Sequence, residues 1–377
     1  MAIAAATSLT TVIAPSALAQ TEPTRTVASA AATRASDPVP LVIGHRGASG
    51  YRPEHTLASW RLAIQMGADY VEPDLVSTKD GVLVARHENE ISGTTDVADH
   101  PEFADRYTTK VIDGRSISGW FTEDFTLAEL KTLRAKERLP DVRPDNTRYD
   151  GRFEVPTFEE FLQMVQQESR KRGVKIGIYP ETKHPTYFDS IGLSLEEPLV
   201  ASLKRHGLDR PNARVIIQSF ETGNLRELNG MTQVPLAQLV DASGAPYDLV
   251  AAGDPRTYRD LVTPEGLAWI STYADGLGAN KNLVIPRDAD GYLTEPTALV
   301  GDAHAAGLVV HIWTIRDENQ FLPKDFWIGT DPNAKGDSIS EIHAFLDAGV
   351  DGVFADQPDT AVFARDTWLE EQTLSAS

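Results

Sequence analysis

The sequence predicts an α/β protein, a (β/α)8 barrel of the TIM type with an insertion over the C-terminal mouth of the barrel. Two observations favour this fold class. From Leu41 onward, short apolar runs alternate with segments of helical period, which is the pattern of a parallel α/β fold. Charged and imidazole side chains follow several of the apolar runs, at the strand ends where a barrel builds its active site. A chain of 377 residues, 41% of them hydrophobic, can bury the core of such a barrel.

Nine apolar runs are candidate strands, one more than a barrel of eight strands requires. Too little chain separates the second run from the third to hold a helix, so we expect an irregular first half. We also expect one of the nine to be a hairpin arm or a loop. The runs are Leu41–His45, Tyr70–Leu75, Val82–His87, Lys175–Glu181, Arg214–Ser219, Pro235–Val240, Gly276–Ala279, Val309–Thr314 and Gly352–Ala355.

Six segments between these runs have helical period. Thr157 stands where it can cap the helix that begins at Phe158, and a glycine follows the end of four of the helices. These glycines are Gly173, Gly207, Gly307 and Gly349. The segments are Thr56–Met66, Phe158–Lys171, Glu197–Arg205, Thr222–Leu228, Pro296–Ala305 and Ser338–Ala348.

The alternation of strands and helices stops between residues 89 and 155. This stretch is rich in Asp, Arg, Thr and Gly and has one helical segment near Leu127–Arg134. A structureless connection of this length is unusual inside a compact domain, so we interpret it as an insertion packed over one mouth of the barrel. The barrel domain is expected to span residues 39–366, with a C-terminal tail at 367–377.

The first 38 residues differ in composition from the rest. Residues 1–19 contain no Asp, Glu, Lys or Arg and end in Ala17-Leu18-Ala19, a small-x-small site typical of a secretory signal peptide. The usual basic segment at its start is missing, because no Lys or Arg precedes Arg25. Residues 20–38 are rich in Ala, Thr, Ser and Pro, and we expect a disordered spacer. The protein is therefore expected to be secreted or extracytoplasmic.

The overall composition excludes several classes of function. The formal net charge is −20, and an acidic protein repels polyanions, so nucleic acid is not the expected partner. The absence of cysteine excludes disulfides, thiolate metal sites and a cysteine nucleophile. No apolar run downstream of the N-terminus is long enough for a transmembrane helix. The oligomeric state is not predicted.

Reactive side chains gather at four consecutive strand ends near the N-terminus. Because Glu72 and Asp74 are two residues apart, a strand would point both into the barrel lumen. Three carboxylates of hard oxygen favour Ca²⁺ or Mg²⁺. An Arg and a Lys beside such a cation can neutralise a phosphate, and two His can divide the proton transfers of phosphodiester cleavage. The residues are His45, Arg46, Glu72, Asp74, His87, Glu181 and Lys183.

A series of short motifs in a fixed order resembles the glycerophosphodiester phosphodiesterases, in particular their long bacterial periplasmic type. The resemblance runs from about Val42 to Phe363. The motifs are HRGASGYRPEHTL at 45–57, GADYVEPDL at 67–75, TKDG at 78–81, His87, YPETK at 179–183, QSF at 218–220, YADGLG at 273–278, HIWT at 311–314 and DGVFAD at 351–356.

The resemblance implies a role for each matching position. Glu72, Asp74 and Glu181 match metal ligands, for one divalent cation with Ca²⁺ favoured and Mg²⁺ possible. His45 and His87 match the catalytic acid–base pair. The positions that match substrate-binding residues are Arg46, Lys183, Trp313, Gln218 and Phe220, and Glu54 is a supporting residue. The chain departs from the family pattern at Glu88, where an Asp is common, and Pro73 lies between two of the metal ligands, so both put the geometry of the rim in doubt.

Simpler interpretations of the late motifs stay open. Trp313 is as well explained as a core aromatic, and Gln218 as a partner of backbone groups. Asp351 and Asp356 are expected to be structural. Five further histidines have no evident partner in the sequence and are left outside the site: His55, His184, His206, His304 and His343.

The function that the resemblance implies is metal-dependent hydrolysis of small glycerophosphodiesters, such as glycerophosphocholine and glycerophosphoethanolamine, to sn-glycerol 3-phosphate and an alcohol. An alternative is phospholipase D-like cleavage of lysophospholipid or sphingomyelin headgroups, which needs an open apolar mouth. A non-enzymatic alternative is a secreted phosphate-ester binding protein.

The leader sequence gives a first testable prediction. If residues 1–19 are a signal peptide, the native protein recovered from outside the cytoplasm begins at or near Gln20. N-terminal sequencing of that protein measures this directly. An intact Met1 on the native protein would contradict the prediction.

Overall fold

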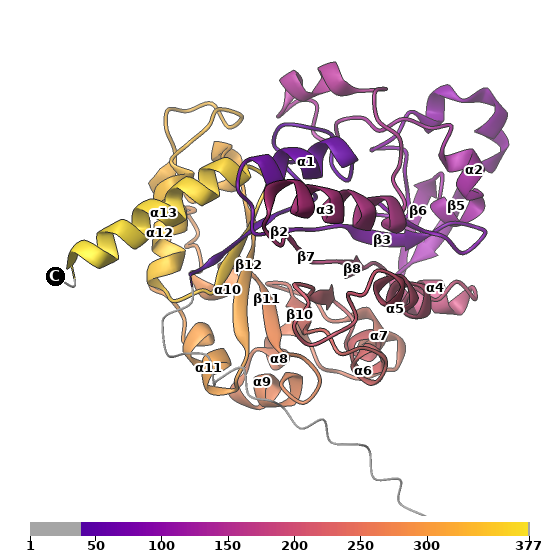
Figure 1. Cartoon of the computed structure of the whole chain (residues 1–377). Coiled ribbons are helices and arrows are strands. Elements are labelled where there is room, and N and C mark those ends of the chain that lie inside the picture. Colours follow the sequence, from indigo (N-terminus) through magenta and orange to yellow (C-terminus); the bar gives the residue numbers. More distant parts are fainter. Residues whose placement is uncertain (1–38, 376–377) are drawn as a thin grey trace, which may run out of the picture.

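A computed structural model of the chain describes residues 39–375, which contain one large curled sheet (Figure 1). Its strands follow the order β4-β3-β8-β9-β10-β11-β12-β13-β1-β2-β7. β2 and β3 are two halves of one run, as are β7 and β8, and both halves of the first run pair with the second. The sheet therefore closes into a ring of eight parallel strands, as predicted. The strands are β1 (Leu41–Gly44), β2 (Tyr70–Val71), β3 (Asp74–Ser77), β7 (Gly177–Ile178), β8 (Glu181–Thr182), β9 (Ile217–Ser219), β10 (Leu236–Val240), β11 (Gly276–Asn280), β12 (Val309–Ile315) and β13 (Gly352–Ala355).

Two prolines interrupt neighbouring strands of the ring. Pro73 separates β2 from β3, and Pro180 separates β7 from β8. A proline has no N–H to donate to the ladder, so each run is split where the proline stands. The carbonyl groups still pair across the break, because Glu181 N donates to the carbonyl of Pro73 at 3.0 Å and Gln218 N donates to that of Pro180 at 2.9 Å. The barrel thus stays closed while Glu72 leaves the regular ladder.

The run predicted as the third barrel strand is not part of the ring. β4 (Leu83–Ala85) is antiparallel to β3, so the surplus run, which was expected to be a hairpin arm or a loop, is a hairpin arm. The prediction that four consecutive barrel strands carry the reactive groups is therefore wrong for one of them. β3 continues past the mouth, and β4 returns along it to bring His87 back beside Asp74, whose carbonyl accepts from Arg86 N at 2.9 Å.

Helices surround the ring, and the predicted helix signals hold. Thr157 caps α3 in a reciprocal arrangement with Glu160, and Gly173 ends that helix in the left-handed conformation, which glycine adopts without a steric penalty. The short helices α4 and α7–α10, and the long α13, were not predicted. The helices outside the insertion are α1 (Leu57–Gln65), α3 (Phe158–Arg172), α4 (Pro185–Ser190), α5 (Glu196–Arg205), α6 (Thr222–Met231), α7 (Tyr247–Ala251), α8 (Tyr258–Leu261), α9 (Pro264–Ile270), α10 (Lys281–Val284), α11 (Leu299–Ala305), α12 (Ser338–Asp347) and α13 (Pro358–Ser375), with the 3₁₀ turns η6 (Asn319–Phe321) and η7 (Lys324–Phe326).

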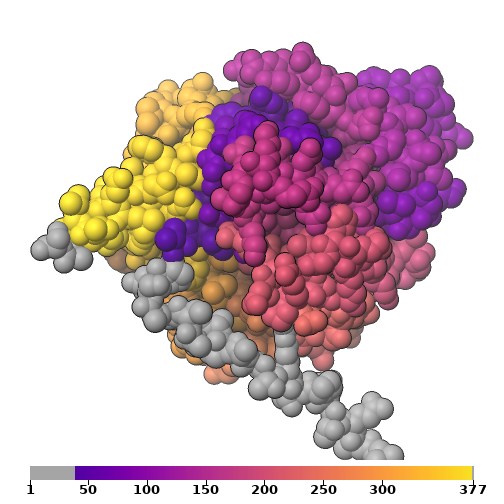
Figure 2. Space-filling model, in the orientation of Figure 1, coloured from indigo at the N-terminus to yellow at the C-terminus, as the bar shows by residue number. Residues whose placement is uncertain are grey.

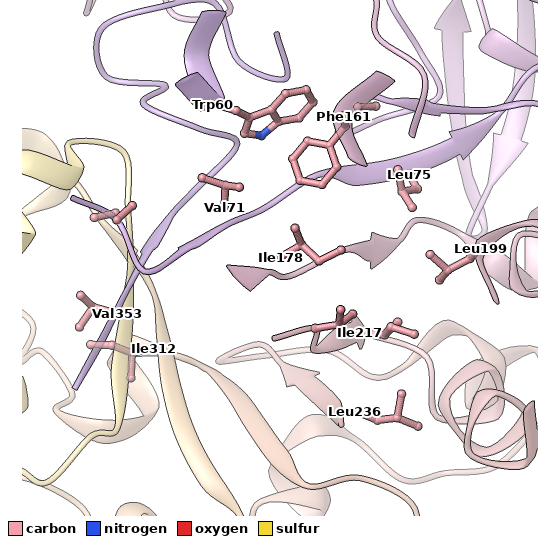
Figure 3. Close-up of a cluster of buried hydrophobic side chains, with 14 of the residues drawn as sticks. Trp60, Val71, Leu75, Phe161, Ile178, Leu199, Ile217, Leu236, Ile312 and Val353 are labelled. Carbon is pink, nitrogen blue, oxygen red and sulfur yellow. The ribbon is translucent and has the colours of Figure 1, made fainter. Parts of the chain in front are cut away.

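The main core lies between the ring and its helices. Figure 3 shows strand residues such as Val71 and Ile178 pointing toward side chains of the surrounding helices. Trp60 of α1 meets Phe161 of α3 edge-on with ring centroids 4.6 Å apart, and both are fully buried. The Trp60 indole N–H also donates to the carbonyl of Glu72 at 2.7 Å. This core therefore anchors the interrupted strand at the break.

A smaller cluster fills the barrel lumen. Ile43, Tyr179, Ala237 and Phe354 are buried together there, on the strand face opposite the main core. Tyr179 and Phe354 meet edge-on at 5.0 Å, and Trp313 packs against the cluster. This packed floor closes the lumen, so the polar groups at the C-terminal mouth stand above an apolar base.

Residues 89–155 pack beside β3 and α3, toward the upper right of Figures 1 and 2, and their buried apolar side chains join the main core. Arg143 of this segment bonds Asp356 after β13, and Asp113 bonds His184 after β8, so the insertion contacts the C-terminal side of the barrel. Its elements are η2 (Val97–Asp99), η3 (Pro101–Arg106), β5 (Thr108–Ile112), β6 (Arg115–Gly119), η4 (Thr122–Asp124), α2 (Leu127–Leu130) and η5 (Pro144–Tyr149).

Of the predictions for the two ends of the chain, only the one for the C-terminal end falls on described residues. The α13 helix runs without interruption to Ser375, so residues 367–375 of the predicted tail continue a helix. The predicted signal peptide and spacer lie outside the described residues. Between residues 39 and 375, no helix has the length and apolar character needed to cross a bilayer.

Candidate active site

Three buried carboxylates come together at the C-terminal mouth of the barrel. Glu72 stands in the break between β2 and β3, Asp74 begins β3, and Glu181 begins β8, where it pairs with Asp74 in register. One oxygen of each lies within 4.8 Å of the others, and each residue is at most 5% exposed. The structure thus brings together the trio that the sequence predicted as metal ligands.

Cations and amides surround the trio. The Arg46 backbone N–H donates to Glu72 at 2.9 Å, and its side-chain Nε lies 3.5 Å from Asp74. Lys183 Nζ donates to Glu181 at 2.9 Å. His55, which the sequence analysis left outside the site, holds the Oδ2 of Asp74 at 2.9 Å. Each carboxylate therefore has at least one donor of its own.

The pKa values of the three carboxylates shift in opposite directions. Burial and the neighbouring carboxylates raise the pKa of Glu72 well above its usual range, and burial raises the pKa of Glu181 to about 7. Burial also opposes ionisation of Asp74, but His55 and Arg46 outweigh it and hold the pKa of Asp74 well below its usual range. Crowding three anions at one buried point is unfavourable, and a divalent cation would relieve it.

The donor set fits a hard divalent cation. All three groups offer carboxylate oxygen, the ligand type of Ca²⁺ and Mg²⁺. Moreover, Asp74 Oδ1 is buried and accepts no hydrogen bond from any described residue. A buried oxygen without a partner is costly unless an ion or water satisfies it.

His45 is held by a buried carboxylate. Its Nδ1 lies 2.5 Å from Asp356 Oδ1, and its Nε2 lies 3.8 Å from Glu72. An acceptor at Nδ1 keeps the proton on that nitrogen and leaves Nε2 as the free base. Burial, followed by the charge of Arg46, lowers the pKa of His45 to about 4, although Asp356 opposes the shift. Asp356 was expected to be structural, and only the tertiary contact shows its place beside His45.

His87 has a parallel arrangement. Its Nδ1 lies 2.9 Å from Glu88, and its Nε2 lies 3.3 Å from Lys183 Nζ. Glu88 is in turn bonded by His184 at 2.9 Å, a second histidine that the sequence analysis left out. Burial, with Arg46 and Lys183, lowers the pKa of His87 to about 3. Glu88, noted as a departure from the family pattern, therefore fixes the ring of His87.

A cavity of about 110 Å³ opens between these groups. Polar residues, including both histidines, form most of the lining, and apolar residues form the rest. Phe220 and Trp313 meet edge-on there with ring centroids 5.6 Å apart. The apolar wall is Phe220, Leu239, Trp313 and Phe354, and the polar lining is His45, Arg46, Glu72, His87, Glu181, Gln218, Thr314 and Arg316.

Some predicted residues serve differently from what was expected. Gln218 Nε2 donates to Glu72 at 2.7 Å, so Gln218 holds a carboxylate rather than backbone groups. Trp313 both packs on the lumen cluster and lines the cavity. Glu54 lies outside the carboxylate trio and pairs with Arg46 at 3.0 Å. Arg316 lines the cavity and was missed, because a lone Arg after a strand carries no signal that separates it from a surface residue.

The chain matches the model of the glycerophosphoryl diester phosphodiesterase family over residues 45–360. It is 36% identical over 330 residues to a glycerophosphodiester phosphodiesterase from Arabidopsis thaliana, covering 84% of this chain and 83% of the relative. It is 32% identical over 346 residues to a glycerophosphodiester phosphodiesterase from Haemophilus influenzae, covering 85% of this chain and 88% of the relative.

Solved structures share the fold. A putative glycerophosphoryl diester phosphodiesterase from Silicibacter pomeroyi matches with a TM-score of 0.61 at 21% identity, covering 88% of this chain and 95% of that one. A phosphodiesterase from Oleispira antarctica, solved in complex with the product sn-glycerol-3-phosphate, matches with a TM-score of 0.57 at 23% identity, covering 87% of this chain and 97% of that one.

The carboxylate trio gives a second prediction. Glu181→Gln removes one anionic oxygen donor and should weaken Ca²⁺ binding more than about 100-fold, since loss of residues that only support metal ligands already costs 10- to 100-fold. Calorimetric titration of the purified protein with Ca²⁺ measures the affinity. Glu227→Gln, which removes the same charge from the exposed face of α6, is the matched control and should bind as the wild type does. Equal affinities of the two variants would contradict the prediction.

Proposed function

The chain belongs to the glycerophosphoryl diester phosphodiesterase family, and from this premise we propose that it hydrolyses small glycerophosphodiesters to sn-glycerol 3-phosphate and an alcohol with a divalent cation and two histidines. It is a phosphodiesterase, as its relatives at 30% identity and above are. The non-enzymatic alternative is therefore set aside.

The observation that carries the proposal is one cavity lined by both histidines and two of the three clustered carboxylates. Glu72, Asp74 and Glu181 would hold the cation, with Ca²⁺ favoured by the resemblance to the periplasmic type and Mg²⁺ possible. When bound, the cation would supply positive charge beside the phosphate. No other cluster of three such groups occurs within residues 39–375.

Two basic side chains beside the carboxylates would bind the phosphate. Arg46 lies against Asp74 and lines the cavity, and Lys183 bridges Glu181 and His87. Their nitrogens would bind the non-bridging phosphate oxygens and offset the negative charge that grows as the ester bond breaks. Because both are already ion-paired, they are held in place before substrate enters.

The histidines would carry the protons. One ring Nε2 would accept the proton of the attacking oxygen, which is that of water or of the substrate's own glycerol hydroxyl. The other histidine would take up a proton as the anionic phosphate binds beside it, because a nearby anion raises the pKa of an imidazole, and would then give that proton to the departing alkoxide. Attack by the glycerol hydroxyl would pass through a cyclic phosphate, which water then opens. The carboxylates Asp356 and Glu88 hold the two rings for these transfers.

The small cavity favours a headgroup-sized substrate over a lipid. Pockets for larger ligands usually measure about 300–1,000 Å³, several times the cavity observed here. The apolar wall of Phe220 and Trp313 can cover the alcohol portion, but it offers little room for an acyl chain. This argues against the phospholipase D-like alternative.

A substrate comparison tests the proposal. The full-length enzyme should release sn-glycerol 3-phosphate from glycerophosphocholine, with kcat/KM at least about tenfold higher than for lysophosphatidylcholine, because an acyl chain whose poor fit costs only about 1.4 kcal/mol already gives that factor. Activity should vanish in EDTA and return with added Ca²⁺. Full activity in excess chelator would contradict the role of the cation, and a preference for lysophosphatidylcholine would contradict the substrate class.

The histidines give a further prediction. Ala at His45 or at His87 should lower kcat about 100- to 10,000-fold, the usual contribution of a general acid or base, while Ca²⁺ affinity stays near that of the wild type. The variant that lacks the proton donor should recover on a p-nitrophenyl phosphodiester, whose leaving group needs no proton, and the other variant should not. Kinetics of both variants on both esters assign the two roles. A loss smaller than tenfold in both would mean that the pair is structural.

A further inference from the structure

We propose that Arg143, carried by the insertion, is a positioning residue for the reaction: it fixes Asp356, and Asp356 in turn orients His45 and Arg316. The insertion then completes the active site rather than only covering it. This inference rests on the proposed role of His45.

Asp356 is the meeting point of three basic groups. Its Oδ1 is hydrogen-bonded to His45 Nδ1 at 2.5 Å. Its Oδ2 accepts hydrogen bonds from Arg143 Nη2 at 2.7 Å and from Arg316 Nε at 2.9 Å. The carboxylate is 1% exposed. Because one oxygen serves His45 and the other serves the arginines, rotation of the carboxylate would break all three contacts at once.

The position of Arg143 is fixed independently of Asp356. Its Nε and Nη2 donate to the two oxygens of Glu318 at 2.7 and 3.2 Å, and its Nη1 donates to the carbonyl of Ser49 at 3.1 Å. A guanidinium bound this way to a carboxylate has little freedom to turn. Arg143 is 6% exposed and Glu318 is 4% exposed, so solvent does not compete strongly for these bonds.

A second contact runs from Arg143 to the same histidine. The carbonyl that Arg143 binds belongs to Ser49, and the Ser49 hydroxyl donates to the carbonyl of His45 at 2.8 Å. Arg143 therefore fixes both the ring partner of His45 and the loop that follows β1. Asn146, also in the insertion, contributes a weaker bond to the Ser49 carbonyl at 3.4 Å.

Arg316 is the other group that Asp356 directs. It lines the cavity, and its guanidinium lies over the Phe321 ring with 4.6 Å to the centroid. Only its Nε makes a hydrogen bond within residues 39–375, so its two Nη nitrogens are available at the cavity. An arginine stacked on one side and bonded at Nε offers a preorganised pair of donors to substrate oxygens.

Kinetics on the full chain test the inference. Arg143→Gln should lower kcat for glycerophosphocholine about 10- to 100-fold, the usual cost of losing a group that orients a functional ligand, with Ca²⁺ affinity unchanged. Arg143→Lys should be impaired to a similar degree, because Lys keeps the charge but cannot reach Glu318, Ser49 and Asp356 together. Arg148→Gln, a change of equal charge at an exposed position in the η5 turn that follows Arg143, should behave as the wild type does.

A double-mutant cycle separates positioning from simple stabilisation. If Arg143 acts in part through His45, the loss of kcat in the Arg143→Gln/His45→Ala variant is smaller than the product of the two single losses, and the remainder reflects Arg316. Full additivity of the two losses would overturn the inference, as would a thermally unstable Arg143→Gln whose folded fraction keeps the wild-type kcat. Should that variant fail to fold, Asp356→Asn replaces it in the cycle, with the same expectation.

The two proposals fail in different ways. A His45→Ala variant with the wild-type kcat would contradict both the proposed chemistry and this inference. A slow His45→Ala beside an Arg143→Gln of unchanged kcat would overturn the inference alone.

Discussion

The site depends on one constraint: three carboxylates are buried within reach of a single ion. Glu72, Asp74 and Glu181 are each at most 5% exposed, so neighbouring protein groups or a bound cation must offset most of their charge. Arg46, Lys183 and His55 offset part of it. Burial and the neighbouring carboxylates still raise the pKa of Glu72, and a bound cation would offset the charge that these donors leave uncompensated. Most of the unusual local structure serves this arrangement.

The backbone departs from a regular barrel at the positions that carry the carboxylates and His87. Proline breaks in two neighbouring strands let Glu72 leave the ladder while Asp74 and Glu181 stay paired in register. The hairpin of β3 and β4 returns His87 to the mouth from outside the ring. A uniform ring of eight strands and eight helices would have no residue in that position, so this irregular first half is the part of the fold that carries the chemistry.

The two histidines are built on the same plan from different parts of the chain. His45 and Asp356 follow β1 and β13, which are paired neighbours in the barrel. His87 and Glu88 are adjacent in sequence, and His184 holds Glu88 from the barrel side. In both cases a carboxylate at Nδ1 directs Nε2 toward the cavity. The insertion reaches both: Arg143 contacts His45 through Asp356, and Asp113 contacts His87 through His184 and Glu88.

The sequence by itself determined the fold class, an irregular first half with one surplus strand run, and most of the reactive residues at the mouth, because strand periodicity and the order of short motifs are local properties. It could not assign His55, His184, Asp356 or Arg316, since each gains its partner from a residue distant in the chain. Asp356, for example, lies 311 residues from His45. Closure of the barrel places β13 beside β1. This pairing brings Asp356, which was expected to be structural, into contact with His45. Patterns along a chain predict which groups are present, whereas tertiary contacts decide what each group is bonded to.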